Sequence, residues 1–148
     1  MRHTTVSIPL LLILIWTNHI QVIAQEKVSC PFTEQFNVYI INKLPPNSGS
    51  LELHCASGDD DLGTHKLTFG QDFHWKFCES FLANTLYFCH FWWGSKERAF
   101  NTFNSKWKER SPTDYLYWEV RSDGFYLAYN RNDAKSFKKY ADWQNRKG

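Results

Sequence analysis

Short runs of strand-forming residues recur along this chain, and each run ends at turn-forming residues. In the run Leu51–Cys55, apolar residues alternate with Glu52 and His54, which is the period of a strand with one buried face. The run Phe73–Cys78 alternates in the same way. Further runs cover residues 36–42, 64–69, 85–93, 99–103, 115–121 and 125–129. The pattern predicts an all-β fold, an antiparallel β-sandwich of about eight strands.

Two details near the C-terminus refine this prediction. Ser122-Asp123-Gly124 separates the last two runs, and Asp-Gly between such runs indicates a hairpin turn. Residues Ala134–Trp143 fit either one short helix or a final strand, and the sequence leaves both open.

The first two dozen residues have the pattern of a secretory signal peptide. A positive start at Arg2 precedes the uncharged apolar run Ile8–Trp16, and the segment ends on the small residue Ala24. Polar residues at 17–21 interrupt the apolar run, whereas a membrane-spanning helix needs about 20 predominantly apolar residues; an uncleaved anchor is the alternative. We expect residues 1–24 to be removed and residues 25–148 to form one secreted, extracellular domain without stable membrane insertion.

All four cysteines lie in the expected mature domain: Cys30, Cys55, Cys78 and Cys89. An even number in an oxidising compartment predicts two disulfides, which would stabilise a small sandwich. Three pairings are possible, and the sequence does not choose among them. If Cys55 pairs with Cys89, closing that loop contributes about 4 kcal/mol on the chain-entropy model.

Charge is divided unevenly along the mature chain. Residues 25–95 hold four basic and eight acidic side chains, and residues 96–148 hold twelve basic and seven acidic ones. Such a division either orients an approaching partner or anionic surface, or is simply a solvated surface.

The motifs of common enzymes are absent, since the chain has no GxSxG, HExxH or P-loop sequence. Three adjacent acids, Asp59–Asp61, lie between Gly58 and Gly63. Calcium binding is one interpretation, but three consecutive carboxylates cannot all point inward. A turn in which one Asp accepts backbone N–H groups is favoured.

Histidine and tryptophan side chains raise two further alternatives. His54, His65, His74 and His90 follow no metal-ligand spacing, so we expect solvated or hydrogen-bonded strand histidines. Indole rings at 92, 93, 107, 118 and 143 suit either a sugar-binding platform or the core, and most occupy apolar positions. Core packing is favoured for most of them.

One motif, together with matching segments before and after it, points to a known family. Residues 53–67 read LHCASGDDDLGTHKL; residues 37–44, 70–77, 84–91, Trp118, 123–126 and 142–143 carry further matching segments in the same order. The chain resembles the plant self-incompatibility S1 family, the S-protein homologues, over nearly all of residues 36–143. Cys55 and Cys89 match family positions. Leu116 stands where many members have Cys, and Cys30 and Cys78 lie outside the family's positions, so the family's pairing is not carried over.

The resemblance implies a secreted β-sandwich without enzymatic activity, and one branch of the family is a stigma-side signal that pollen recognises through a membrane receptor. We therefore expect an extracellular signalling ligand of an unidentified cell-surface receptor. The alternative is a defence protein whose basic C-terminal half binds carbohydrate or a membrane surface. We expect a monomer without cofactor, metal or nucleic-acid partner.

Two expectations concern the site itself. The shared turn residues Asp59, Asp60, Asp61, Leu62 and Gly63 are predicted to be structural. Partner binding is predicted in the loops 43–50, 95–111 and 131–139, with Lys106, Lys108 and Arg110 as the candidate residues, because loops on a rigid scaffold commonly carry binding.

Overall fold

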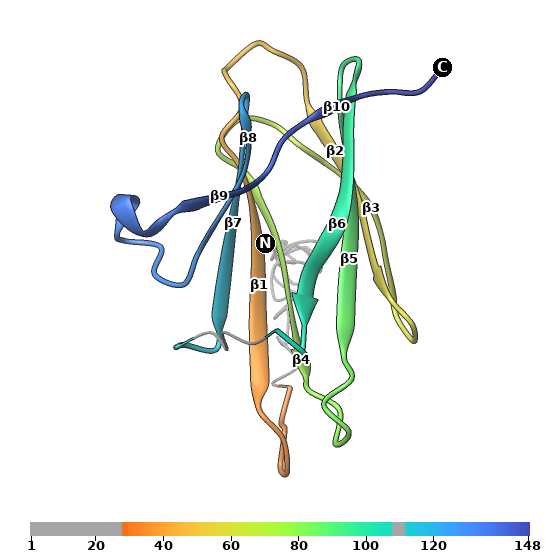
Figure 1. The fold of residues 1–148 in the computed structure, drawn as a ribbon, viewed down its shortest axis with the longest axis vertical. Helices are drawn as coiled ribbons and strands as arrows, with labels where there is room; N and C mark the ends of the chain where they lie inside the picture. The colour runs from red at the N-terminus through yellow and green to blue at the C-terminus, as the bar shows by residue number, and fades with distance from the viewer. Residues whose placement is uncertain (1–27, 108–111) are drawn as a thin grey trace, which may run out of the picture.

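The computed structural model describes residues 28–107 and 112–148, which form two β-sheets packed face to face (Figure 1). The first sheet contains β1 (Gln35–Asn42), β4 (Asp72–Cys78), β7 (Tyr115–Arg121), β8 (Gly124–Ala128) and β9 (Lys138–Ala141). The second contains β2 (Leu51–Ser57), β3 (Asp61–Leu67), β5 (Leu86–Trp93), β6 (Lys96–Asn104) and β10 (Gln144–Asn145). The predicted all-β sandwich is confirmed. The expected signal peptide lies outside the described residues.

One pair of neighbouring strands departs from a purely antiparallel arrangement. The first sheet has the order β4-β1-β7-β8-β9 and the second β10-β6-β5-β2-β3. β1 pairs antiparallel with β4 but parallel with β7, with Val38 opposite Leu116. β1 is therefore an inner strand whose second neighbour, β7, comes from a segment far along the chain.

The predicted loop 95–111 is wrong over most of its described length. Residues Lys96–Asn104 form β6, which pairs with β5 from Trp93 opposite Lys96 to Leu86 opposite Asn104. The polar residues of this segment are compatible with a strand because alternate side chains point to the solvent face. Of the described residues in this predicted loop, Ser95 and residues 105–107 lie outside strands.

Residues 134–143 combine both interpretations that the sequence left open. Ala134–Ser136 form one 3₁₀ turn, η1, and Lys138–Ala141 form β9. The chain then crosses from the first sheet to the second, where β10 pairs with β6 (Figure 1).

The core lies between the sheets and follows the alternation that the sequence displays. Leu53, Phe91, Trp118 and Phe125 are fully buried. The Trp118 indole N–H also donates to the Thr102 carbonyl on β6, at 3.1 Å, and this bond connects the first sheet to the second. Core packing is confirmed for Trp118; Trp93, Trp107 and Trp143 pack against the core while partly exposed. Trp92 instead stacks on His90, with ring centroids 3.9 Å apart.

Two disulfides are present, as the cysteine count predicts. Cys55 and Cys89 are directly opposite on β2 and β5 and are fully buried. Cys30 and Cys78 join the segment before β1 to the end of β4. One disulfide therefore lies inside the sandwich and the other fastens its N-terminal segment.

The uneven charge along the chain becomes an uneven charge across the molecule. In both sheets, strands β1–β5 lie on one side and β6–β10 on the other. The sheets stack in the same sense, since Phe77 on β4 packs against Tyr87 on β5, while Trp118 on β7 packs against Phe100 on β6. The sandwich therefore has one side built from the acidic segment and one side built from the basic segment.

Candidate functional site

The acidic motif forms a compact turn that satisfies its own backbone. The Ser57 hydroxyl accepts from the Asp60 amide at 3.0 Å, and the Ser57 amide donates to the Asp60 carbonyl at 2.7 Å. Asp61 opens β3, and its Oδ1 accepts from the Gly63 amide at 2.9 Å. Gly63 has φ +79°, a conformation that glycine adopts without strain. These bonds close the β2–β3 connection.

A row of histidine–carboxylate pairs crosses the outer face of the second sheet. His54 Nε2 lies 2.7 Å from Asp61 Oδ1, and His90 Nε2 lies 2.9 Å from Glu97 Oε2. The Gly63 amide, followed by His54, lowers the pKa of Asp61, and the hydrogen bond with His90 lowers the pKa of Glu97. His54 and His90 are opposite residues on β2 and β5.

The described residues contain no group of three His, Cys, Asp or Glu side chains arranged to hold a metal ion. Each histidine of the row, together with His65 and His74, has a hydrogen-bond partner instead. Pairs of this kind on a solvated surface contribute little to stability.

The structure does not bring the predicted binding loops together. Residues 43–50 follow β1 at the end where β7 finishes, whereas Lys106 follows β6 at the opposite end, where β5 and β7 begin. Residues 131–139 project from the side of the first sheet (Figure 1). Lys106 is exposed; Lys108 and Arg110 lie outside the described residues.

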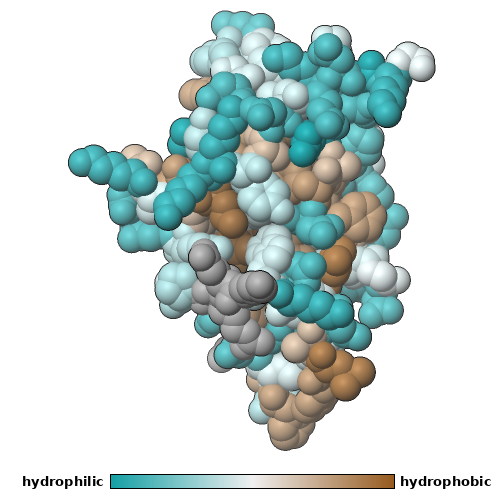
Figure 2. Space-filling view, in the orientation of Figure 1, coloured by the Kyte–Doolittle hydropathy of each residue, from teal (hydrophilic) through white to brown (hydrophobic). Residues whose placement is uncertain are grey.

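A different surface feature gathers at the end that carries Lys106. Phe32, Phe81 and Leu82 expose 79%, 79% and 83% of their area, and the rings of Phe32 and Phe81 lie 6.2 Å apart. We call these three residues the apolar tip. In Figure 2 the lower end of the molecule, where Figure 1 places the β4–β5 loop and the start of β1, is largely brown.

Hydrogen bonds hold the loop 79–85 that carries two of these side chains. The Ala83 amide donates to the Ser80 carbonyl at 2.9 Å, and the Asn84 amide donates to the Ser80 hydroxyl at 3.1 Å. The Ser80 amide donates to Thr85 Oγ1 at 2.9 Å. The loop is thus fixed by its own polar groups, and its apolar side chains point away from the core.

The segment with Phe32 is fastened to this loop from the other side. The Cys30–Cys78 disulfide joins the two segments, and the Glu79 amide donates to the Glu34 carbonyl at 2.9 Å. The Ser105 amide donates to the Thr85 carbonyl at 3.0 Å, which places Lys106 beside the same loop.

Sequence reasoning missed the apolar tip. The available signal was Phe81-Leu82-Ala83 standing between two strand runs, flanked by Ser80 and Asn84. Apolar residues in so short a connection either cover the core or protrude, and the sequence alone does not distinguish these outcomes.

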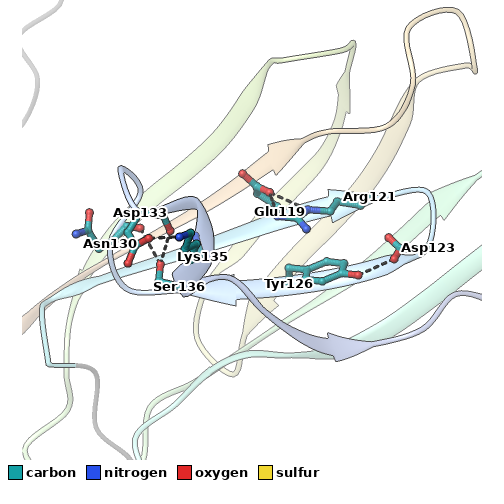
Figure 3. Close-up of polar contacts among 8 residues, drawn as sticks. All are labelled: Glu119, Arg121, Asp123, Tyr126, Asn130, Asp133, Lys135 and Ser136. Atoms are coloured by element: carbon teal, nitrogen blue, oxygen red, sulfur yellow. Dashed lines mark hydrogen bonds and ion pairs between the residues drawn. The ribbon is translucent and has the colours of Figure 1, made fainter.

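The outer side of β7 and β8 carries the polar contacts drawn in Figure 3. Arg121 forms a two-nitrogen contact with Glu119 Oε2 at 2.9 and 2.6 Å, and the Tyr126 hydroxyl donates to Asp123 at 2.6 Å. That bond raises the pKa of Tyr126 and lowers the pKa of Asp123. In the 130–136 loop, Asp133 accepts from the Lys135 amide and the Ser136 hydroxyl.

A surface hollow of about 560 Å³ lies beside this loop. Its walls include Trp107, Tyr129 and Tyr140, and Lys138 and Lys139 lie at its border. Lys139 forms an ion pair with Asp142 at 2.5 Å. Aromatic rings beside amines and hydroxyls are groups that can contact a sugar.

No helix in residues 28–107 and 112–148 is long and apolar enough to span a membrane.

Comparison with known proteins identifies the family. The family described as plant self-incompatibility protein S1 matches residues 37–143, which include all of β2–β9 and most of β1. The chain belongs to this family. The resemblance that the motif at 53–67 suggested is confirmed.

Relatives from Arabidopsis thaliana are identical to this member at about a third of the aligned positions. S-protein homolog 29 is 33% identical over 72% of this chain and 76% of its own length. S-protein homolog 5 is 36% identical over 50% of this chain, and the match spans 57% of that relative. S-protein homolog 19 is 38% identical over 60% of this chain and 65% of its own length.

A solved structure shows the same fold. It has a TM-score of 0.60 and 19% identity, and the match covers 76% of this chain and 97% of that one. That structure represents self-incompatibility protein homologues, described as a widespread family of small, highly stable, secreted plant proteins. At this identity the likeness concerns the fold.

Proposed function

We propose that this protein is a secreted, non-enzymatic plant ligand that acts by binding a receptor protein on a cell surface. The observation that carries the proposal is the family match over residues 37–143, which spans nearly the whole sandwich. The structural relative is described as secreted, and the expected signal peptide at 1–24 agrees with export.

The geometry supports this proposal in two ways. Two disulfides suit an oxidising extracellular environment. A rigid sandwich also presents fixed loops at both ends, and such loops commonly carry recognition. A protein ligand of this kind needs a stable surface and no catalytic group.

Binding to living cells tests the proposal. The full chain is expressed in a secreting plant host, and the exported product is labelled at its C-terminus. We expect saturable binding to plant protoplasts, which lack cell-wall polysaccharide, and loss of that binding after brief surface proteolysis of the cells. Protease-resistant binding, or no binding to any tissue tested, would contradict a receptor protein as the partner.

The hollow beside Trp107, Tyr129 and Tyr140 favours one second candidate function. We propose as the alternative a defence protein that binds carbohydrate with this hollow. A glycan array separates the two functions: selective binding to one sugar class, lost in Tyr140→Ala, would favour the alternative. Tyr140 exposes 48% of its area but its ring also packs edge-on against Trp118 at 4.9 Å, so the variant must show the urea midpoint of the wild type before a loss of binding is assigned to the hollow.

A further inference from the structure

We propose that the apolar tip, formed by Phe32, Phe81 and Leu82, enters an apolar pocket on the protein partner. The inference rests on the proposed function, because the partner in question is the cell-surface receptor. It assigns recognition to the end of the sandwich formed by residues 30–34 and 79–85.

Exposure singles out these three side chains. They are the most exposed of the large hydrophobic residues in the described chain, and the next, Phe69, exposes 56%. At roughly 150–250 Å² for each large ring, the tip presents on the order of 450 Å² of apolar surface. A contiguous apolar surface of this size on a small monomer commonly marks an interaction site.

The tip is also held ready for binding. The bonds within residues 80–85, the Cys30–Cys78 disulfide and the Glu79–Glu34 backbone bond fix both segments that carry it. A rigid contact loses little conformational entropy when it binds. Rigid aromatic side chains that fill a pocket are typical of the few residues that dominate an interface.

A second copy of the chain fits this tip poorly. A stable protein interface buries about 800 Å² on each partner, and the apolar tip offers on the order of half of that area. Two convex tips that meet would bury only this area, so self-association through the tip alone would fall short of a stable dimer, whereas a pocket that encloses the tip also contacts the loops around it.

A lipid surface is also disfavoured, because amphipathic membrane contacts combine apolar side chains with Lys or Arg. Residues 28–34 and 79–85 contain Glu34 and Glu79 and no Lys or Arg. In the adjoining segment, residues 105–107, the positively charged side chain is Lys106. Among the described residues, a protruding apolar contact with Lys106 beside it instead fits a concave protein pocket with an acidic group at its rim.

Binding to protoplasts also tests this inference, with paired variants. Phe81→Ser with Leu82→Ser should weaken saturable binding about 30-fold or more, as expected for a contact that dominates an interface. Phe69→Ser is the matched control, because Phe69 is an exposed phenylalanine in the turn before β4, at the opposite end of the strand that leads to the tip. The control should bind like the wild type.

Folding and other occupants are checked in parallel. Urea midpoints of all variants should match the wild type, and Phe32→Ser, on the other segment, supplies an independent variant of the tip. If the wild type binds cells and both sets of tip variants bind equally well, the tip inference is wrong while the receptor proposal stands. If the wild type does not bind at all, the proposed function fails first.

Two further measurements could contradict the inference that the tip enters a pocket on a protein. Tip-dependent flotation with vesicles of phosphatidylcholine and phosphatidylserine would assign the tip to a membrane. A concentration-dependent dimer in sedimentation, abolished by the tip variants, would assign it to self-association. Neither signal is expected at micromolar protein.

Discussion

At the scale of single residues, Gly124 is the glycine whose surroundings leave the least room for a side chain. It is the first residue of β8, directly after the turn that follows β7, and has φ +143°. A Cβ there would clash with the Ala141 backbone oxygen and approach the end of the Lys139 side chain. The hairpin and the edge pairing with β9 both depend on the missing side chain.

Gly124→Ala should therefore lower the free energy of unfolding by about 2–4 kcal/mol, combining backbone strain with overpacking. Urea unfolding measures the change. Gly58→Ala is the matched control, since nothing lies within 4 Å of its Cβ position and its φ is outside the left-handed range. Equal midpoints for the two variants would contradict the steric argument.

Asp61 gives a prediction in acid. The Gly63 amide and His54 hold the pKa of Asp61 below its usual value of about 3.8. The folded state then binds fewer protons than the unfolded state, so the contribution of this carboxylate is complete above pH 4 and is lost as pH falls through the lowered pKa. We expect the stability advantage of the wild type over Asp61→Asn to shrink between pH 6 and pH 2.5.

Unfolding curves at a series of pH values measure this difference. Asp59→Asn is the control, because the Asp59 backbone amide, and not its carboxylate, contacts Ser57 in the turn. A pH-independent gap between wild type and Asp61→Asn would mean that the carboxylate charge is unimportant here.

Residue-scale sequence reasoning succeeds for strand faces and fails for exposed apolar side chains. The alternation in 51–55 predicts a buried face, and Leu51, Leu53 and Cys55 are fully buried. Phe81 and Leu82 have the same apolar character but protrude. Burial depends on which distant segment covers a side chain, and no local pattern records that.

At the scale of elements, the sequence predicts where strands form but does not predict which strands pair. The runs predicted at 36–42, 73–78 and 115–121 correspond to β1, β4 and β7 within a residue or two. Their pairing across the chain, antiparallel for one neighbour and parallel for the other, has no local signature. Within β6 the strand predicted at 99–103 is confirmed, whereas the charged start at 96–98 has no strand pattern of its own and is set by pairing with β5.

The Cys30–Cys78 disulfide should act on one element more than on the sandwich. In a Cys30→Ser, Cys78→Ser variant, we expect the Glu79 amide, bonded to Glu34, to exchange its hydrogen at least about tenfold faster, because the two segments are no longer tethered covalently and separate more easily. Global stability should fall by up to about 4 kcal/mol on the chain-entropy model. Hydrogen exchange measures both.

Amides in the paired strands β2 and β5 serve as the internal control, because the Cys55–Cys89 disulfide is retained there. They should lose protection only in step with the global stability. If the Glu79 amide also follows global stability alone, the N-terminal segment is held by contacts other than its disulfide.

At the scale of the whole molecule, the two sides of the sandwich differ in charge while the net charge stays small. The net charge of +2 does not indicate such a separation of charge. The separation follows from the strand order, which keeps β1–β5 together on one side and β6–β10 on the other in both sheets. The uneven sequence therefore survives folding as an uneven surface.

Ion-exchange chromatography should detect this asymmetry. We expect the mature protein to bind a cation exchanger at pH 7 more strongly than its net charge suggests, because the basic side can face the resin. Lys135→Glu with Lys138→Glu should abolish most of the retention. Lys43→Glu with Lys76→Glu makes the same change in net charge on the acidic side.

Those control substitutions should reduce retention far less. All four lysines are exposed, so neither double variant should unfold. Equal losses of retention would mean that the resin senses net charge only.

The parallel pairing of β1 with β7 also sets an order of events during biosynthesis. All four cysteines lie before residue 90, so both disulfides can close while the later chain is still being made. β1 nevertheless keeps one unsatisfied edge until residues 115–121 arrive from the ribosome. An open edge of this kind can recruit foreign strands. An oxidised but incomplete sheet therefore waits for the last quarter of the chain, which closes it.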